Sequence, residues 1–238
     1  AVSVSEVSFD LSKIIARKQK VVRKLVLGVK GKLTAGNVTI VTGEASVIDK
    51  NHVLCGDETY ECDNLLLCTG SETFIPPIPG VDTVPYWTHR DALDNKELPK
   101  SLAIIGGGVI GMEFASFFNS LGVEVTVIEM LDEILGGMDK ELSAMLRAEY
   151  AKRGIKFMLD TKVVALSEVA SGNGDTQQIQ VNYENAEGAG CVIAERLLMS
   201  VGRRPVTKGF GLENLNLDKT ARGNIQEDGQ RSEEHTSE

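Results

Sequence analysis

The stretch SLAIIGGGVIGMEFASFFNSLGVEVTVIEM, residues 101–130, predicts a strand, a glycine turn, a helix and a second strand, in that order. Its glycines at 106, 108 and 111 have the spacing G-x-G-x-x-G. In such a turn the first glycine lets the backbone turn sharply, the second leaves room for a pyrophosphate, and the third lets the helix pack close to the strand. The helix that follows directs N–H groups and a partial positive charge at the phosphates. The stretch therefore predicts a dinucleotide-binding βαβ unit in an α/β protein.

The acid at the end of the second strand bears on the choice of dinucleotide. Glu129 stands where this fingerprint expects a carboxylate to accept from the ribose 2′-hydroxyl. No arginine follows within MLDEILGGM, so a 2′-phosphate would meet negative charge, and NAD(H) is favoured over NADP(H). A glycine-rich turn that binds no nucleotide is the alternative, but the complete strand–helix–strand context favours the nucleotide. The predicted helix ends at Gly122 and has an apolar face at helical spacing: Ile110, Phe114, Phe117 and Leu121.

Residues 10–34 are predicted to form a long helix that Asp10 caps. Its second face is basic, which a membrane surface or a nucleic acid could use. We favour a solvated face and expect neither partner, because the chain has a net charge of −9 and long basic side chains commonly cover helix flanks. No apolar run approaches the roughly 20 residues that cross a bilayer. The apolar face consists of Leu11, Ile14, Ile15, Val22, Leu25, Val26, Val29 and Leu33.

Residues 38–70 alternate as strands do, with a turn at Gly56–Asp57. Three successive leucines predict that the last strand, ending at residue 70, is buried on both faces, as in a parallel sheet. Small residues at the end of such a strand would let a flat ligand approach closely. These residues are Thr69, Gly70 and Ser71.

Four prolines between residues 76 and 85 predict a linker between domains. After the glycine fingerprint, a second helix is predicted from Asp139 to Arg153, closed by Gly154. Strands follow, with a hairpin tip at residues 171–175. The apolar face of the second helix consists of Leu142, Met145, Leu146 and Tyr150.

The cysteines and histidines have neither metal-site nor redox-pair spacing, so no metal is expected. The cysteines are expected to be small apolar filler in a reducing compartment, which favours a cytoplasmic location. The last eight residues, RSEEHTSE at 231–238, can be back-translated into a common sequencing-library adapter, and the chain has no initiating Met. We expect this tail to be artefactual and the chain to be a piece of a longer protein, although a natural acidic tail has similar composition.

Five motifs in order resemble the flavin-dependent pyridine nucleotide–disulfide oxidoreductases: TGS, PPIPG, GGGVIGMEF, VIE and SVGRRP. The resemblance covers essentially all of residues 1–230. It implies an α/β fold of two Rossmann-like domains, with a nearly complete NAD(P) domain inserted into a partial FAD domain. The implied divisions are the partial FAD domain at 1–75, the linker at 76–85, the NAD domain at 86–215 and a return segment to the FAD domain at 216–230.

The resemblance also implies which residues contact the cofactors FAD and NAD. Gly43 would approach the FAD adenosine, and the TGS residues Thr69, Gly70 and Ser71 would line the FAD site. Glu129 would hold the adenosine ribose, Gly202 would approach the nicotinamide, and Val163 would flank the adenine, although core packing explains Val163 equally well. The NAD pyrophosphate and nicotinamide would be wrapped by Gly106, Gly107, Gly108, Val109, Ile110, Gly111, Met112 and Glu113.

The implied activity is FAD-dependent oxidation of protein-bound dihydrolipoamide with NAD⁺ as acceptor. The partners would be lipoyl domains of 2-oxoacid dehydrogenase or glycine-cleavage complexes, and the parent protein a homodimer. Glu113 would lie near the flavin in a supporting role; the chain by itself is expected to be inactive, because the family's redox disulfide and His–Glu base have no match in it. The alternatives are a sibling flavoprotein, of transhydrogenase or NADH oxidase type, and a non-catalytic NAD(H)-binding module.

Overall fold

Five strands form a parallel sheet in the computed structural model, which describes residues 8–170 and 177–226. Their order is β5–β12–β6–β7–β8, and all neighbours run parallel. The central strands are mostly apolar and buried, as expected for strands covered on both faces. The strands span Tyr86–Trp87 (β5), Ser101–Ile105 (β6), Glu124–Ile128 (β7), Lys156–Met158 (β8) and Arg196–Met199 (β12).

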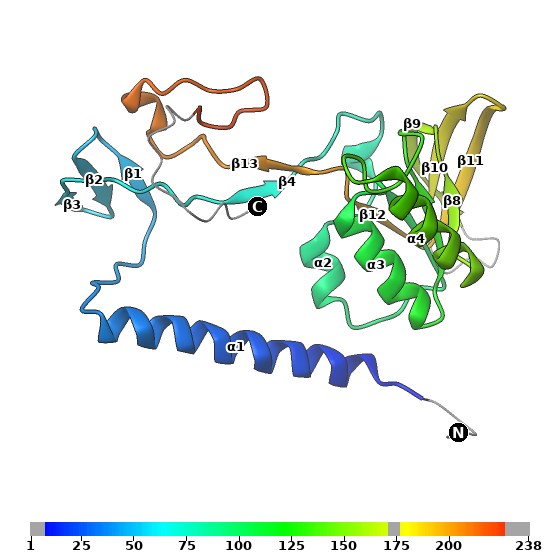
Figure 1. The fold of residues 1–238 in the computed structure, drawn as a ribbon, viewed down its shortest axis with the longest axis horizontal. Coiled ribbons are helices and arrows are strands. Elements are labelled where there is room, and N and C mark those ends of the chain that lie inside the picture. Colours follow the sequence, from blue (N-terminus) through cyan, green and yellow to red (C-terminus); the bar gives the residue numbers. More distant parts are fainter. Residues whose placement is uncertain (1–7, 171–176, 227–238) are drawn as a thin grey trace. The chain divides into compact units, whose positions relative to one another are not determined.

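Helices cover one face of this sheet and a second sheet covers the other (Figure 1). Successive residues of a strand point to opposite faces. In β6, Leu102 and Ile104 therefore pack with the helices, whereas Ala103 and Ile105 pack with the second sheet. Phe118, which is 1% exposed, is the largest fully buried side chain of the helix-side core. The helices span His89–Asp94 (α2), Val109–Ser120 (α3) and Lys140–Lys152 (α4).

The second sheet is antiparallel, has the order β11–β10–β9, and connects β8 to β12 along the chain. Leu166, Ile179 and Val181 are at most 4% exposed and pack against the parallel sheet. The predicted hairpin is confirmed by the pairing of β9 with β10, whereas its predicted tip at residues 171–175 lies outside the described residues. The strands span Lys162–Ala170 (β9), Gln177–Asn185 (β10) and Gly188–Ala194 (β11).

Contacts within the chain divide it into two units, Ala1–Leu25 with Thr73–Gly202 and Val26–Glu72 with Arg203–Glu238. The layers above belong to the first unit, as does the proline-rich segment 76–85 with its short 3-10 helix η1, Val81–Thr83. The domain boundaries expected from the sequence stay a prediction, and residues 231–238 lie outside the described part. None of the helices in the described ranges combines the length and the apolar composition that a membrane span requires.

The second unit contains a small antiparallel sheet, β1–β2–β3. The turn predicted at Gly56–Asp57 is confirmed, since it joins β2 to β3 and Gly56 has a φ of +62°.

The long helix α1 is also confirmed, and Asp10 accepts from the Lys13 N–H at its start. The bounds are Leu11–Ala35 (α1), Ala45–Val47 (β1), His52–Cys55 (β2), Glu58–Glu61 (β3), Ser71–Thr73 (β4), Arg203–Pro205 (β13) and Leu212–Leu215 (η2), and β4 pairs with β13.

Two parts of the strand prediction over residues 38–70 are wrong. Residues 38–44 and 62–70 form no strand, and Leu66 is 85% exposed. A parallel strand buried on both faces needs neighbouring strands for its N–H and C=O groups. No strand in the described part of the chain pairs with residues 62–70, so their leucines lack the sheet that the prediction assumed.

The apolar face predicted for α3 is displaced from the buried one. Its buried side chains include Met112, Ala115 and Phe118, whereas the four predicted positions are half-buried. Both stripes of this helix are apolar, so spacing alone could not choose between them. The predicted end at Gly122 is confirmed by its φ of +86°.

The prediction for α4 is correct in its bounds and only partly correct in its buried face. Leu142 and Met145 are 62% and 63% exposed, whereas Ser143 is 1% exposed. Similarly, Leu11 and Ile15 are the only buried residues of α1 within the described range. Periodicity shows that a helix has an apolar stripe, but the neighbouring elements decide which part is covered.

Candidate dinucleotide-binding site

The first fingerprint glycine occupies a position that a side chain cannot share. Gly106 follows β6 with a φ of +104°, and a Cβ atom there would lie 2.5 Å from the carbonyl oxygen of Ser200. The buried Ser200 hydroxyl is shared between the carbonyls of Ile105 and Gly106, at 3.1 and 3.0 Å. The ends of β6 and β12 are thus joined where the strand order of the sheet reverses, which is where such sheets bind ligands. Sequence reasoning missed Ser200; its only signal was a small polar residue directly after an apolar strand.

The other two glycines of the fingerprint have different surroundings. A Cβ atom on Gly111 would lie 2.2 Å from the Gly106 carbonyl oxygen, so this glycine lets α3 approach the turn closely. A Cβ atom on Gly108 would meet nothing within 4 Å. Gly108 is the N-cap of α3 and makes no side-chain cap, so the first N–H groups of the helix are left for anionic oxygens. Open space beside a helix N-terminus fits the pyrophosphate of a dinucleotide.

Glu129 lies directly against the glycine turn. Its Oε2 accepts from the Gly107 N–H at 2.6 Å, and its Oε1 accepts from the Leu131 N–H at 2.9 Å. A carboxylate has about four acceptor positions, so it can still accept from a ribose hydroxyl. The structure therefore brings together the acid and the turn that the fingerprint separates along the chain.

The residues that follow Gly108 differ in what they could offer a nucleotide. Val109 is 56% exposed, and Glu113 is exposed on α3. Ile110 is half-buried, and the Met112 side chain is 2% exposed within the helix-side core. Met112 can therefore reach a ligand only through its backbone.

Val163 and Gly202 lie at two other points of the first unit. Val163, on β9, packs against the core between the two sheets, which is the alternative role considered for it. Gly202 has a φ of +128°, and its carbonyl accepts from the Phe74 N–H at 2.9 Å. A Cβ atom on Gly202 would meet nothing within 4 Å, so the space beside it is open.

The TGS residues are held in the second unit by the segment that contains the GRRP motif. The Thr69 hydroxyl donates to the Val206 carbonyl at 2.6 Å, and the Gly70 carbonyl accepts from the Val206 N–H at 3.0 Å. Nε of Arg203 donates to the Ser71 hydroxyl at 2.8 Å. Two motifs that lie far apart in the sequence are thus brought into direct contact.

All four cysteines are free, and two of them contradict the expectation of apolar filler. Cys68 and Cys191 are exposed, because residues 62–70 form no buried strand and Cys191 stands on the outer strand β11. Cys55 is half-buried, and its Sγ would lie 2.7 Å from a Cβ atom on Gly43. In the described part of the chain, no group of three or more His, Cys, Asp or Glu could hold a metal ion.

The loop between β7 and α4 carries two ion pairs with residues at the start and in the middle of α4. Arg147 donates from Nε and Nη2 to the two carboxylate oxygens of Glu133, each at 2.8 Å. These hydrogen bonds hold the pKa of Glu133 below its usual value. Lys140 lowers the pKa of Asp132 in the same way at the exposed part of this loop. Both basic side chains are therefore engaged with acids of the loop.

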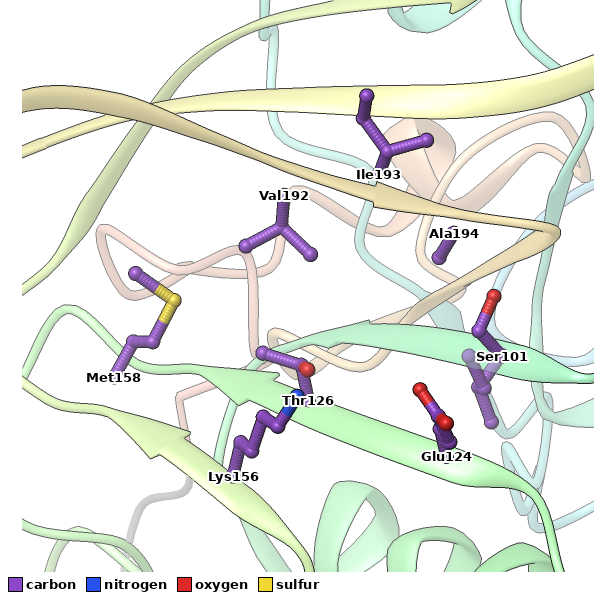
Figure 2. A pocket seen from close by; sticks show the side chains of 9 residues that line it. Ser101, Glu124, Thr126, Lys156, Met158, Val192, Ile193 and Ala194 are labelled. Atoms are coloured by element: carbon purple, nitrogen blue, oxygen red, sulfur yellow. The ribbon is translucent and has the colours of Figure 1, made fainter. Parts of the chain in front are cut away.

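A cavity of about 240 Å³ lies elsewhere in the first unit (Figure 2). Ser101 and Glu124, which begin β6 and β7, line it together with Lys156 and apolar residues of β11. Gly106 and Glu129 follow the opposite ends of the same strands. The cavity is therefore separate from the glycine turn.

A glycine turn beside an open helix N-terminus, at the point where the strand order of a parallel sheet reverses, is typical of α/β nucleotide-binding proteins. The chain belongs to the pyridine nucleotide-disulphide oxidoreductase family, whose model matches residues 3–236. This match confirms the family resemblance, and the mixed sheet architecture confirms the α/β fold class.

Sequence and structural similarity to known proteins supports this family assignment. The chain is 36% identical over 217 residues to a dihydrolipoyl dehydrogenase of Acholeplasma laidlawii, an alignment that covers 90% of this chain and 61% of that protein. It is 34% identical over 236 residues to the mitochondrial dihydrolipoyl dehydrogenase of Homo sapiens, covering 94% and 45%. The solved structure of the HOCl-induced flavoprotein disulfide reductase RclA from Escherichia coli matches with a TM-score of 0.81 and 28% identity, covering 92% and 48%. The chain thus spans between 45% and 61% of the length of these three relatives.

Proposed function

We propose that this chain is part of a flavoprotein that oxidises protein-bound dihydrolipoamide and passes the electrons to NAD⁺. Its similarity to proteins named dihydrolipoyl dehydrogenase supports this reaction. The observation that carries the nucleotide part is the Glu129 carboxylate, which lies hydrogen-bonded against a turn whose second glycine faces open space. A carboxylate at that place suits a free ribose hydroxyl and disfavours a 2′-phosphate.

In this proposal the residues of the first unit bind and orient the dinucleotide, which supplies the hydride-acceptor chemistry when bound. The first N–H groups of α3 and the open side of Gly108 hold the pyrophosphate. Ser200 keeps Gly106 in the conformation that the turn requires. Gly202 would approach the nicotinamide and Val163 would flank the adenine from its place against the core, while the backbone from Gly106 to Glu113 would contact the middle of the dinucleotide.

The second unit would contribute part of the FAD site through Gly43, Thr69, Gly70 and Ser71. The Arg203–Ser71 hydrogen bond would fix the last of these residues. The partners would be lipoyl domains of 2-oxoacid dehydrogenase or glycine-cleavage complexes, and the parent protein would be a cytoplasmic homodimer. A second candidate function is that of a sibling flavoprotein, which reduces a different disulfide or oxidant. The similarity to the flavoprotein disulfide reductase from Escherichia coli supports this second candidate.

Titration of the 238-residue chain with NADH and NADPH tests the nucleotide part of this proposal. We expect NADH to bind more tightly, and Glu129→Gln to raise its dissociation constant about 10- to 150-fold, because a hydrogen bond to a charged group contributes about 1.5–3 kcal/mol. Glu129→Gln should also reduce the ratio of the dissociation constants for NADPH and NADH, because the negative charge that repels a 2′-phosphate is gone.

Glu124→Gln is the matched control, because Glu124 is an exposed acid at the other end of β7. It should leave both affinities unchanged. Equal affinity of the parent chain for NADH and NADPH would contradict the role assigned to Glu129.

A further inference from the structure

Gly107, between the first two fingerprint glycines, is held by the loop that follows β7. Its N–H donates to Glu129 Oε2 at 2.6 Å, and its carbonyl accepts from the Leu135 N–H at 2.8 Å. A Cβ atom on Gly107 would lie 3.2 Å from both Oε2 of Glu129 and Cγ2 of Ile134. The loop of residues 130–138 therefore packs directly on the turn of the proposed pyrophosphate site.

This loop holds a conformation that a leucine does not favour. Leu135 has a φ of +55°, in the left-handed region that side chains with a Cβ atom rarely adopt. Such a conformation persists only where the surroundings determine it. Ile134, which is 1% exposed in the helix-side core, supplies one constraint. The residue before it, Glu133, supplies another.

Arg147 of α4 is the residue that holds Glu133. Its Nε and Nη2 donate to the two carboxylate oxygens at 2.8 Å each, and the Glu133 side chain is 11% exposed. Such a two-point pair fixes orientation as well as distance. Glu133 Oε1 also accepts from the Ile134 N–H at 2.9 Å, so the ion pair fixes the backbone immediately before Leu135. A continuous series of contacts runs from Arg147 through Glu133 and Leu135 to Gly107.

We propose that Arg147 is a positioning residue for the dinucleotide. By fixing Glu133, it sets the loop of residues 130–138 and thereby orients the Gly107 peptide and the Glu129 carboxylate. This inference rests on the proposed nucleotide site, because it assigns Arg147 an effect on binding at that site without contact to the ligand.

The test compares Arg147→Met with Arg153→Met in the 238-residue chain. Arg147→Met keeps an unbranched apolar stem and removes both hydrogen bonds, so the dissociation constant for NADH should rise about 3- to 30-fold, as for other couplings through packed contacts. Hydrogen exchange of the Leu135 amide should become faster, while amides of β6 and β7 keep their protection. Arg153 pairs with Glu149 at 3.4 Å on the exposed surface of the same helix, so Arg153→Met should change neither quantity.

Glu133→Gln provides a second variant that removes the charge and keeps the shape. It should weaken NADH binding in the same direction, and the double variant should be little weaker than either single one, because both remove the same pair. If Arg147→Met does not fold, Glu133→Gln carries the same comparison.

The outcomes separate this inference from the function on which it rests. A parent chain that binds no NADH would overturn the proposed function. A parent that binds NADH no better than the folded variants would overturn the positioning role alone. Equal loss of protection at Leu135, β6 and β7 would also overturn it, because the pair would then act only on stability.

Discussion

Single residues of the glycine turn separate the requirements of folding from those of binding. Gly106 and Gly111 are confined by the protein itself, since added Cβ atoms would meet backbone oxygens at 2.5 and 2.2 Å. Gly108 meets no such neighbour, so only a ligand in the open space beside it would require a glycine there. The three positions of one motif should therefore respond differently to the same substitution.

Alanine at positions 111 and 108 gives a matched pair of variants. Gly111→Ala should lower the free energy of unfolding by about 1–3 kcal/mol, as overpacking does. Gly108→Ala should change it by less than about 1 kcal/mol, because a φ of −70° suits alanine. Only Gly108→Ala should weaken NADH binding without loss of stability. Urea denaturation and NADH titration of each variant measure the two effects, and undiminished affinity in a stable Gly108→Ala would show that no phosphate approaches this position.

At the scale of elements, the sequence predicted those whose partners are near in the chain. The unit β6–α3–β7 and the β9–β10 hairpin were predicted because propensity, turn residues and pairing are all local there. The strand predicted at residues 62–70 does not form, because a buried parallel strand depends on neighbouring strands that the local sequence pattern does not reveal. The prediction of the buried face of α4 was wrong for a related reason: Leu142 continues the apolar stripe, yet this residue is 62% exposed in the described part of the structure.

Helix α4 also contains an unfavourable group that a substitution can remove. Ser143 is 1% exposed, and its hydroxyl has no hydrogen-bond partner among the described residues. Ser143→Ala should therefore raise the free energy of unfolding by about 1 kcal/mol, from relief of a buried unpaired hydroxyl and from better helix propensity. Urea denaturation measures this change.

Ser120→Ala, on an exposed serine at the end of α3, is the control, and its free energy of unfolding should stay within about 0.5 kcal/mol of the parent value. A loss of stability at position 143 would instead show that the hydroxyl has a partner.

At the scale of the whole molecule, each unit contains contacts at its candidate cofactor-binding residues that join positions far apart in sequence. Ser200 bonds to Gly106 across 94 positions, and Arg203 bonds to Ser71 across 132. Spacing rules predicted the glycines and Glu129, because that motif lies within one βαβ unit. They could not predict Ser200 or Arg203 as partners, because only the folded sheet and its connections bring those residues together.

The distribution of buried apolar residues predicts that the two units differ in local stability. The first unit holds nearly all of them, whereas Val47 and Leu212 are the buried apolar residues of the second unit within the described ranges. Opening free energies follow buried apolar contacts, so amides of β6, β7 and β12 should exchange at least about a hundredfold more slowly than those of β1–β3. Hydrogen exchange of the 238-residue chain, followed by mass spectrometry, measures both sets at once. Strands of the two sheets that exchanged at one common rate would contradict this prediction.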